Sequence, residues 1–177
     1  MRGRRVAVFA CPIVAILLHL PTLRNDFVFD DQAIVSQNPL LKDLRDLPRL
    51  LVAPYWMNLH QGQRLYRPLT TVSFALNRAL VGHLDPRWFH LGNVLLHACA
   101  TLLVTLLALE MLPGARAPAI AGLLFATHPV HVEAVAGIVG RAEILAASGV
   151  LAGVLCHRRA LYAPAGGGTM WIAGTWG

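Results

Sequence analysis

The sequence predicts an all-α, multi-pass membrane protein, and three observations favour this class. Of the 177 residues, 56% are hydrophobic and 14% are charged, whereas soluble domains carry about 25% charged residues. The mean hydropathy is +0.56. Several apolar runs approach the roughly 20 residues that a membrane-spanning helix needs. These features exclude a disordered chain, a coiled coil and a disulfide scaffold, and they disfavour a soluble enzyme.

The charge of the chain fits membrane flanks better than nucleic acid. The formal net charge is +6, but the arginines are dispersed and form no long basic run. Basic residues that flank apolar helices explain this pattern. We therefore expect membrane lipid as a partner and no nucleic acid.

Residues 1–23 are expected to form a cytoplasmic start and the first membrane helix. The apolar run 6–23 follows Arg2, Arg4 and Arg5. A cleaved signal peptide is the alternative, but the run is long for one and no small-residue cleavage site follows it. Residues 24–90 hold most of the charge and predict a large, folded extracytoplasmic loop.

An amphipathic helix is predicted over residues 68–83 of this loop, since Pro68 suits a first helical turn. Its leucines and Val72 share one face. Two interpretations remain open: the helix lies in the membrane interface, or it packs inside the loop domain.

Membrane helices two to four are expected within residues 91–159. The predicted spans are 91–112, 118–127 and a fourth within 134–156 whose lipid-spanning part starts near Ala142. The third is short unless it continues to residue 132. Residues 160–177 are rich in glycine and alanine and are expected to be a truncated tail.

The second span carries polar residues at four-residue spacing, which places them on one helix face. They are Asn93, His97, Thr101 and Thr105. Such a stripe faces other helices or a cavity rather than lipid. Helix packing is one interpretation, and a channel or transporter pathway is another.

The basic residues at the span ends predict the topology. They all fall on one side, which the positive-inside rule assigns to the cytoplasm. These residues are Arg2, Arg4, Arg5, Arg116, Arg158 and Arg159. The long loop and residues 127–143 are then expected to share the opposite side, the periplasm or the lumen of the endoplasmic reticulum.

Three clusters of ionisable residues are placed on that side. The first is Asp30 and Asp31, flanked by aromatic residues. A partly desolvated aspartate is a better base than a solvated one. In an extended chain the two side chains point in opposite directions, so that one faces a site while an arginine holds the other. A solvated turn or a helix cap is the alternative.

The second cluster centres on Arg67, whose backbone Pro68 restrains. The planar guanidinium suits an anionic group such as phosphate, and an ion pair to a loop aspartate is the alternative. The third cluster contains His128, His131, Glu133, Arg141 and Glu143. Its spacing does not match the His-Glu-x-x-His zinc motif, so no metal site is predicted. Pairing of Arg141 with Glu133 or Glu143 is the structural alternative.

Read together, these motifs resemble one family. Their order is Asn25 to Asp31, Tyr66-Arg67-Pro68-Leu69-Thr70, Phe89 to Asn93 with His97, and His128 through Glu143. The chain is similar, over about residues 20–151, to the N-terminal membrane part of the transmembrane and tetratricopeptide-repeat O-mannosyltransferases. The resemblance implies a partial GT-C glycosyltransferase-like helix bundle with a large first extracytoplasmic loop.

The resemblance also implies an activity and the residues that carry it. The family transfers mannose from a polyprenyl- or dolichyl-phosphate donor to Ser/Thr hydroxyls of acceptor proteins. Asp30 and Asp31 match the acidic pair that includes the catalytic base. Arg67, His128, His131, Glu133, Arg141 and Glu143 fall in motifs expected to contact substrate.

These implications leave several functional expectations. The donor is a lipid-phosphate sugar, no cofactor is specified, and a requirement for a divalent metal is undetermined. The chain is expected in the endoplasmic-reticulum membrane if eukaryotic and in the inner membrane if bacterial. Because four spans are fewer than a GT-C core contains and no tetratricopeptide pattern is visible, a non-catalytic membrane interaction subunit or an inactive truncated product is the alternative function.

Overall fold

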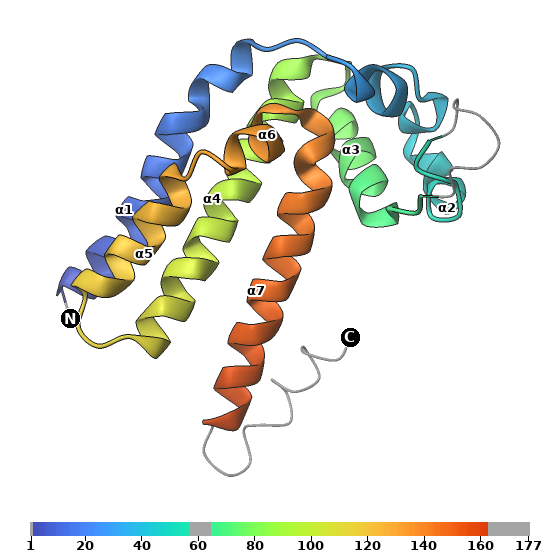
Figure 1. Ribbon diagram of the computed structural model, residues 1–177. Helices are drawn as coiled ribbons and strands as arrows, with labels where there is room; N and C mark the ends of the chain where they lie inside the picture. The colour runs from blue at the N-terminus through green and yellow to red at the C-terminus, as the bar shows by residue number, and fades with distance from the viewer. Residues whose placement is uncertain (1, 57–64, 163–177) are drawn as a thin grey trace. The chain divides into compact units, whose positions relative to one another are not determined.

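The computed structural model describes residues 2–56 and 65–162, and within them every regular element is a helix. The all-α prediction is therefore confirmed. Residues 57–64 of the long loop and 163–177 of the expected tail lie outside the described residues. The α-helices in chain order are α1 (Arg2–His19), α2 (Leu47–Leu50), α3 (Pro68–Val81), α4 (Pro86–Met111), α5 (Arg116–Thr127), α6 (His131–Ala136) and α7 (Arg141–Leu161) (Figure 1).

Short 3₁₀ and π turns complete the described chain. They are η1 (Leu20–Arg24), η2 (Gln32–Ser36), η3 (Pro39–Leu41), η4 (Leu44–Asp46) and η5 (Ile138–Gly140). Asparagine and aspartate start two of them, since Asn38 accepts a hydrogen bond from the Leu40 amide and Asp43 accepts one from the Arg45 amide. Side chains of this kind commonly satisfy the first amides of a helical turn.

Three helical segments in the described residues are long and apolar enough to cross a membrane. They are Gly3–Arg24, Pro86–Met111 and Ile138–Leu161. The third of the four expected spans is different. Helix α5 has 12 residues, which gives about 18 Å at 1.5 Å per residue, against a hydrocarbon thickness of about 30 Å. The third span was expected to be short unless it continued to residue 132, and α5 ends at Thr127, so the described residues contain three long apolar helices and one short one.

The chain divides into two compact units. Among the described residues, the first unit contains 2–18, 96–128 and 145–162, and the second contains 19–56, 65–95 and 129–144. The loop residues and the segment before α7 therefore fold together, although roughly a hundred residues separate the acidic pair from that segment along the chain.

Helices α1, α4 and α5 meet closely in the first unit. A Cβ added to Gly122 of α5 would lie 2.8 Å from Cys11 Sγ of α1, and Thr105 Oγ1 of α4 is nearer still. The Cys11 thiol points to the Ala119 carbonyl at 3.6 Å. Arg159 of α7 donates to Glu110 of α4 at 2.8 Å. A glycine and small side chains thus permit the close helix packing typical of membrane helices.

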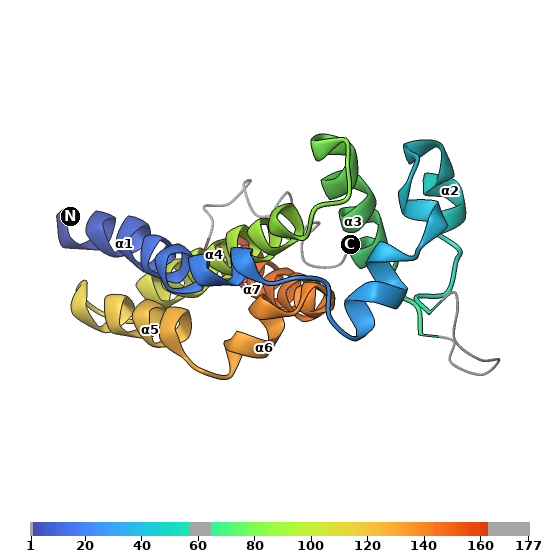
Figure 2. The ribbon, with the colours of Figure 1, turned by 90° about the horizontal axis from the view of Figure 1, so that it is seen from above.

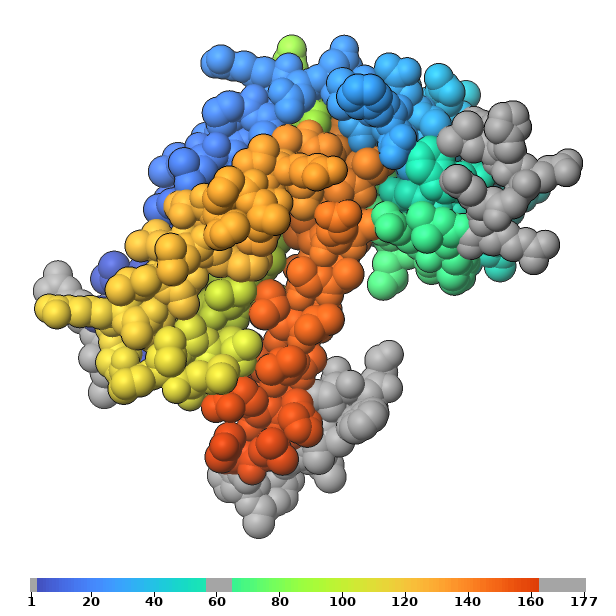
Figure 3. Space-filling view, viewed as in Figure 1, coloured from blue at the N-terminus to red at the C-terminus, as the bar shows by residue number. Residues whose placement is uncertain are grey.

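The outer faces of these helices are apolar. Large hydrophobic side chains are exposed at Val6, Phe9, Ile13, Leu17, Ile120, Leu124, Val150 and Val154. Figure 3 shows the outer surface of α5 and α7 on one side of the first unit. Exposed apolar surface on helices of this length suits contact with lipid.

Most of the polar stripe of α4 is satisfied inside the first unit. The Thr101 hydroxyl donates to the His97 carbonyl at 2.9 Å, and the Thr105 hydroxyl donates to the Thr101 carbonyl at 2.8 Å. The His97 ring stacks on Phe125 with centroids 5.5 Å apart. All three polar side chains are buried. These contacts support the helix-packing interpretation over a pathway through the helices.

The second unit is built on a hydrophobic core that includes three aromatic side chains. Its buried members are Ile34, Val35, Leu41, Leu50, Tyr55, Phe74, Ala75, Phe89 and Ile138. Phe89 of α4 packs edge-on against Phe27 at 5.8 Å and lies 6.1 Å from Phe74 of α3. Figure 2 shows α2 beside α3.

Helix α3 agrees with the predicted helix and shows how both faces are used. It begins at Pro68 and ends at Val81, and the next residue, Gly82, has a φ of 82°, the left-handed cap conformation that glycine adopts readily. Phe74 and Ala75 are buried in the core, whereas Leu69 and Leu80 are 75% and 88% exposed. The helix therefore packs inside the loop unit with one face and leaves a leucine face outside that unit's core.

We expect residues 30 and 133 to react from the same side of the membrane, because both belong to the second unit and their side chains are exposed. Single cysteines Asp30→Cys and Glu133→Cys, in a background that replaces Cys11, Cys99 and Cys156, would be labelled with a membrane-impermeant maleimide. Arg116→Cys is the control expected to react from the other side. Labelling of positions 30 and 133 from opposite compartments would contradict the shared unit.

Candidate functional site

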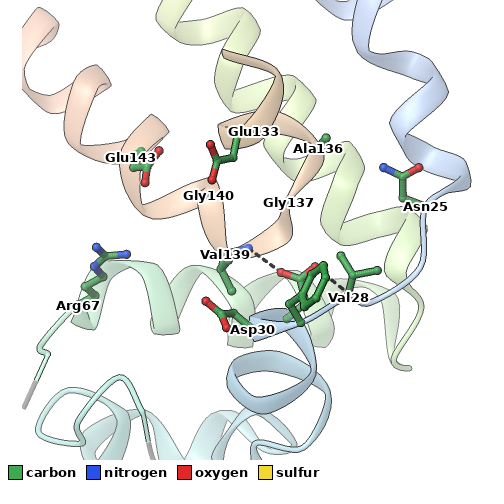
Figure 4. A pocket seen from close by; sticks show the side chains of 12 residues that line it. Asn25, Val28, Asp30, Arg67, Glu133, Ala136, Gly137, Val139, Gly140 and Glu143 are labelled. Atoms are coloured by element: carbon green, nitrogen blue, oxygen red, sulfur yellow. Dashed lines mark hydrogen bonds between the residues drawn. The ribbon is translucent and has the colours of Figure 1, made fainter. Parts of the chain in front are cut away.

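The second unit contains a pocket of about 670 Å³ that brings the predicted acidic and basic clusters together. Five of its lining residues ionise, and four of these are carboxylic acids. They are Asp30, Asp31, Arg67, Glu133 and Glu143. Figure 4 shows Glu133 and Glu143 on one side of the pocket and Asp30 and Arg67 on the facing side. The remaining lining residues are Asn25, Val28, Phe29, Ala136, Gly137, Val139 and Gly140.

The two neighbouring aspartates have different environments. Asp31 is 1% exposed, and its oxygens accept hydrogen bonds from the Val139 amide at 2.9 Å and the Val28 amide at 3.3 Å (dashed lines in Figure 4). Asp30 is exposed. The structure therefore makes Asp31 a fixed acceptor and leaves the Asp30 carboxylate available to a ligand in the pocket.

The backbone around the pair is a tight turn, and this corrects the expectation of an extended chain. The Asp31 amide donates to the Val28 carbonyl at 2.9 Å, and Asp30 and Asp31 already have helical geometry. Among the described residues, two backbone amides hold the buried acid and no arginine pairs with it. Phe29 has a φ of 45°, a left-handed conformation that costs a non-glycine residue roughly 1–3 kcal/mol. The strained turn sets the position of Asp30, which follows it directly.

Arg67 lies where α3 begins and is half-buried in the pocket wall. Its guanidinium carbon is 5.3 Å from the centroid of the Tyr55 ring, a cation–π distance. Within the described residues it forms no ion pair with a loop aspartate. Burial raises the pKa of Tyr55 to about 12, and the nearby Arg67 charge opposes this shift.

The third predicted cluster is divided by the fold. Glu133 of α6 and Glu143 of α7 are exposed and line the pocket. His131 begins α6 but does not line the pocket, and His128 directly follows the last residue of α5 and belongs to the first unit. The two histidines were predicted to contact substrate, and the pocket does not include them.

Arg141 was also predicted to contact substrate, but the structure places it in the core. It is 2% exposed and does not line the pocket. Its guanidinium donates to neutral oxygens of Ser73, Asn77, Phe89 and Asn93. The alternative that Arg141 forms an ion pair with Glu133 or Glu143 is wrong, because its guanidinium donates to these neutral oxygens instead.

Two residues that shape the site were not among the predicted site residues. Asn25 lines the pocket, and Tyr55 supports Arg67. Asn25 stands in the acidic motif, which is the one signal that marks it. No local pattern around Tyr55 connects it to a residue twelve positions later. Among the described residues, no group of three His, Cys, Asp or Glu side chains lies in an arrangement that holds a metal ion.

The fold and the site together define a helical, membrane-type protein with a carboxylate-rich pocket. Comparison with curated proteins gives the family. Mouse Protein O-mannosyl-transferase TMTC2 is 40% identical over 155 residues, covering 86% of this chain and 18% of that protein. Drosophila melanogaster Protein O-mannosyl-transferase Tmtc1 is 41% identical over 152 residues, covering 84% of this chain and 18% of that protein.

A further relative agrees. Human Protein O-mannosyl-transferase TMTC3 is 38% identical over 136 residues, covering 75% of this chain and 15% of that protein. The chain belongs to the TMTC family of protein O-mannosyl-transferases, and it spans less than a fifth of the length of these relatives. No family model matches the chain, and no solved structure matches it.

The turn that forms one pocket wall predicts a specific stability loss. A Cβ on Gly140 would lie 2.7 Å from Ala134 Cα and in contact with other backbone atoms of that residue, whereas a Cβ on Gly149 of α7 meets nothing within 4 Å. We expect Gly140→Ala to lower the free energy of unfolding by about 1–3 kcal/mol, as overpacking does. Gly149→Ala is the matched control and should be neutral or stabilising. Thermal unfolding in detergent measures both, and equal effects would refute the close approach.

The buried phenol predicts a pH dependence. The ordinary tyrosine pKa is 10 and the folded value is about 12, so the folded state holds this proton more tightly. The resulting stability is fully present below pH 10 and is lost as the pH rises towards 12. We expect Tyr55→Phe to remove this loss. Unfolding measured at several pH values tests this difference. In a comparison of the tyrosinate absorbance of the two proteins, Tyr55→Phe should lack the part that the wild type gains near pH 12. If Tyr55→Phe instead lacks a part that the wild type gains at pH 10, the burial of Tyr55 is contradicted.

Proposed function

We propose that this chain forms part of a protein O-mannosyltransferase that transfers mannose from a polyprenyl- or dolichyl-phosphate donor to Ser/Thr hydroxyls. The observation that carries the proposal is the placement of Asp30. It is an exposed carboxylate in a pocket that also holds Arg67, beside a buried partner acid. The relatives' name, Protein O-mannosyl-transferase, agrees with the chemistry that these residues can perform.

Asp30 is the proposed general base. The acceptor hydroxyl attacks the anomeric carbon of mannose and gives its proton to the Asp30 carboxylate. The bond from that carbon to the donor phosphate oxygen breaks, and the lipid phosphate leaves with the electron pair. Attack opposite the leaving group inverts the anomeric centre. A base within about 3 Å of the hydroxyl can accept the proton in the transition state.

Arg67 is the proposed partner of the departing phosphate. Negative charge grows on the leaving oxygen, and a fixed guanidinium stabilises that charge in the transition state. The Tyr55 ring under Arg67 restrains the guanidinium. Because the pocket has four carboxylates and this single arginine among its lining residues, the phosphate is expected at Arg67 and the acceptor peptide near Glu133 and Glu143.

The three long apolar helices agree with a lipid-linked donor. Such a donor keeps its hydrocarbon chain in the bilayer and presents its phosphate at the surface, which requires a site on a membrane-anchored protein. We place the protein in the endoplasmic-reticulum membrane of a eukaryotic cell or the inner membrane of a bacterium, with the pocket on the non-cytoplasmic side. Its partners are then lipid, donor and acceptor protein.

The first test is neutralisation of the base. We expect Asp30→Asn to lower kcat for mannose transfer by roughly 10² to 10⁴, the range for loss of general-base catalysis, with little change in unfolding because Asp30 is exposed. The assay uses the protein in proteoliposomes with dolichyl-phosphate mannose and a Ser/Thr peptide. Asp26→Asn is the matched control, since Asp26 is exposed and outside the pocket.

Two outcomes would change the proposal. Full turnover in Asp30→Asn would remove this carboxylate from the reaction. Binding of the lipid-linked sugar by the wild-type protein without any transfer would favour the non-catalytic alternative for this chain.

A further inference from the structure

Arg141 is a buried cation that no carboxylate neutralises among the described residues. Its Nε donates to Asn93 Oδ1 at 2.8 Å, and its Nη2 donates to Phe89 O at 2.7 Å and Asn77 Oδ1 at 2.9 Å. The other terminal nitrogen donates to Ser73 O at 3.3 Å. The guanidinium carbon lies 4.6 Å from the centroid of the Phe74 ring. The planar fork therefore ties α3 and α4 to the first residue of α7.

Glycine makes room for this arrangement. A Cβ on Gly92 of α4 would lie 2.6 Å from Arg141 Nη2 and 2.7 Å from Asn77 Oδ1. Any other residue at position 92 would displace the guanidinium or its acceptor. Lysine cannot replace Arg141 equally, because an ammonium is a compact donor group that does not reproduce a flat fork with hydrogen bonds in several directions.

Asn93 connects the guanidinium to the pocket wall. While its Oδ1 accepts from Arg141, its Nδ2 donates to the Gly137 carbonyl at 2.8 Å and the Ile138 carbonyl at 3.2 Å. The opposite amide orientation would place NH₂ against a cation and oxygen against two carbonyls. Arg141 thus fixes the orientation of Asn93, and Asn93 fixes two carbonyls of the turn at residues 137–140.

The next group in this turn reaches the acidic pair. The Val139 amide donates to Asp31 Oδ1 at 2.9 Å, so three consecutive residues of the turn are held from outside it. Gly137, Val139 and Gly140 line the pocket. The chain of contacts runs from Arg141 through Asn93 and the turn to Asp31, whose neighbour along the chain is Asp30.

We propose that Arg141 and Asn93 are positioning residues that hold the 137–140 turn so that Val139 fixes Asp31 and Asp30 faces the pocket. Neither residue touches substrate in this proposal. The link to catalysis rests on the proposed role of Asp30, but the network itself does not. Arg141 was predicted from the sequence to contact substrate, and this role replaces that prediction.

Hydrogen exchange of backbone amides in the whole chain, reconstituted in lipid nanodiscs, tests the network without any substrate. We expect Arg141→Lys and Asn93→Leu to speed exchange in segment 137–141 by roughly 5- to 30-fold, the effect of losing one or two buried hydrogen bonds. Exchange in α3 should change much less. Two matched controls, Arg87→Lys on the exposed surface of α4 and the buried Thr105→Val on the same helix, should leave segment 137–141 unchanged.

A second pair of variants approaches the network from its other end and serves if the first pair does not fold. Asp31→Asn keeps an oxygen that can accept from Val139, whereas Asp31→Leu does not. We expect stronger protection of the Val139 amide in Asp31→Asn than in Asp31→Leu. Rescue by the conservative variant would show that the hydrogen bond, and not only the volume, holds the turn.

Kinetics then separate positioning from general stability. In folded Arg141→Lys we expect kcat for mannose transfer to fall about 100-fold, as misplacement of a reacting group by about 1 Å does, with KM for the donor unchanged because Arg67 is intact. A raised KM with unchanged kcat would return Arg141 to a binding role and overturn the proposal. Unchanged exchange at 137–141 in both Arg141→Lys and Asn93→Leu, or faster exchange spread evenly over the second unit, would also overturn it.

The two proposals can fail separately. If the wild-type chain shows no transfer, the proposed enzymatic function fails for this chain, and the exchange measurements still decide whether the network positions Asp30. If transfer occurs and Asp30→Asn retains it, the base assignment fails while the network can stand.

Discussion

The second unit depends on one buried cation. A guanidinium removed from water loses a large hydration free energy, and burial of an unpaired charge is tolerated only when hydrogen bonds replace the lost water. Arg141 meets this requirement with neutral oxygens on α3 and α4 and with two aromatic faces, Phe74 and Phe89. Because one planar group makes these hydrogen bonds to both helices, α3, α4 and the start of α7 have one preferred arrangement. The shape of the pocket wall depends on that arrangement.

The same constraint separates the two neighbouring aspartates. The turn held by Asn93 presents the Val139 amide to Asp31, which becomes a buried acceptor. The Asp30 carboxylate, in contrast, stays exposed in the pocket. Two chemically identical side chains therefore differ in availability, and one of the two amides that hold Asp31 lies more than a hundred residues further along the chain. Geometry of this kind is a common way to separate a reacting group from the group that holds it in place.

The apolar helices suit contact with lipid, whereas the polar pocket suits contact with water and polar groups. In the first unit, small residues such as Gly122 allow close helix contact, and large side chains such as Phe9 and Leu124 face outwards. In the second unit, a hydrophobic core supports short turns and the carboxylate-rich pocket. A protein that handles a substrate with a hydrocarbon tail and a polar head needs both kinds of surface. This pairing is what makes the family's named activity physically reasonable for the proposed site.

The sequence by itself determined the helical class, the long apolar segments and the helix that begins at Pro68, because composition and helical periodicity are local properties. It also marked Asp30, Asp31, Arg67, Glu133 and Glu143, which the fold brings to one pocket. Tertiary structure decided the rest. The burial of Arg141, the support of Arg67 by Tyr55 and the exclusion of His128 and His131 from the pocket depend on contacts between distant segments. A local sequence pattern does not indicate which distant acceptors surround a side chain. The surroundings of these residues could therefore be known only from the folded arrangement.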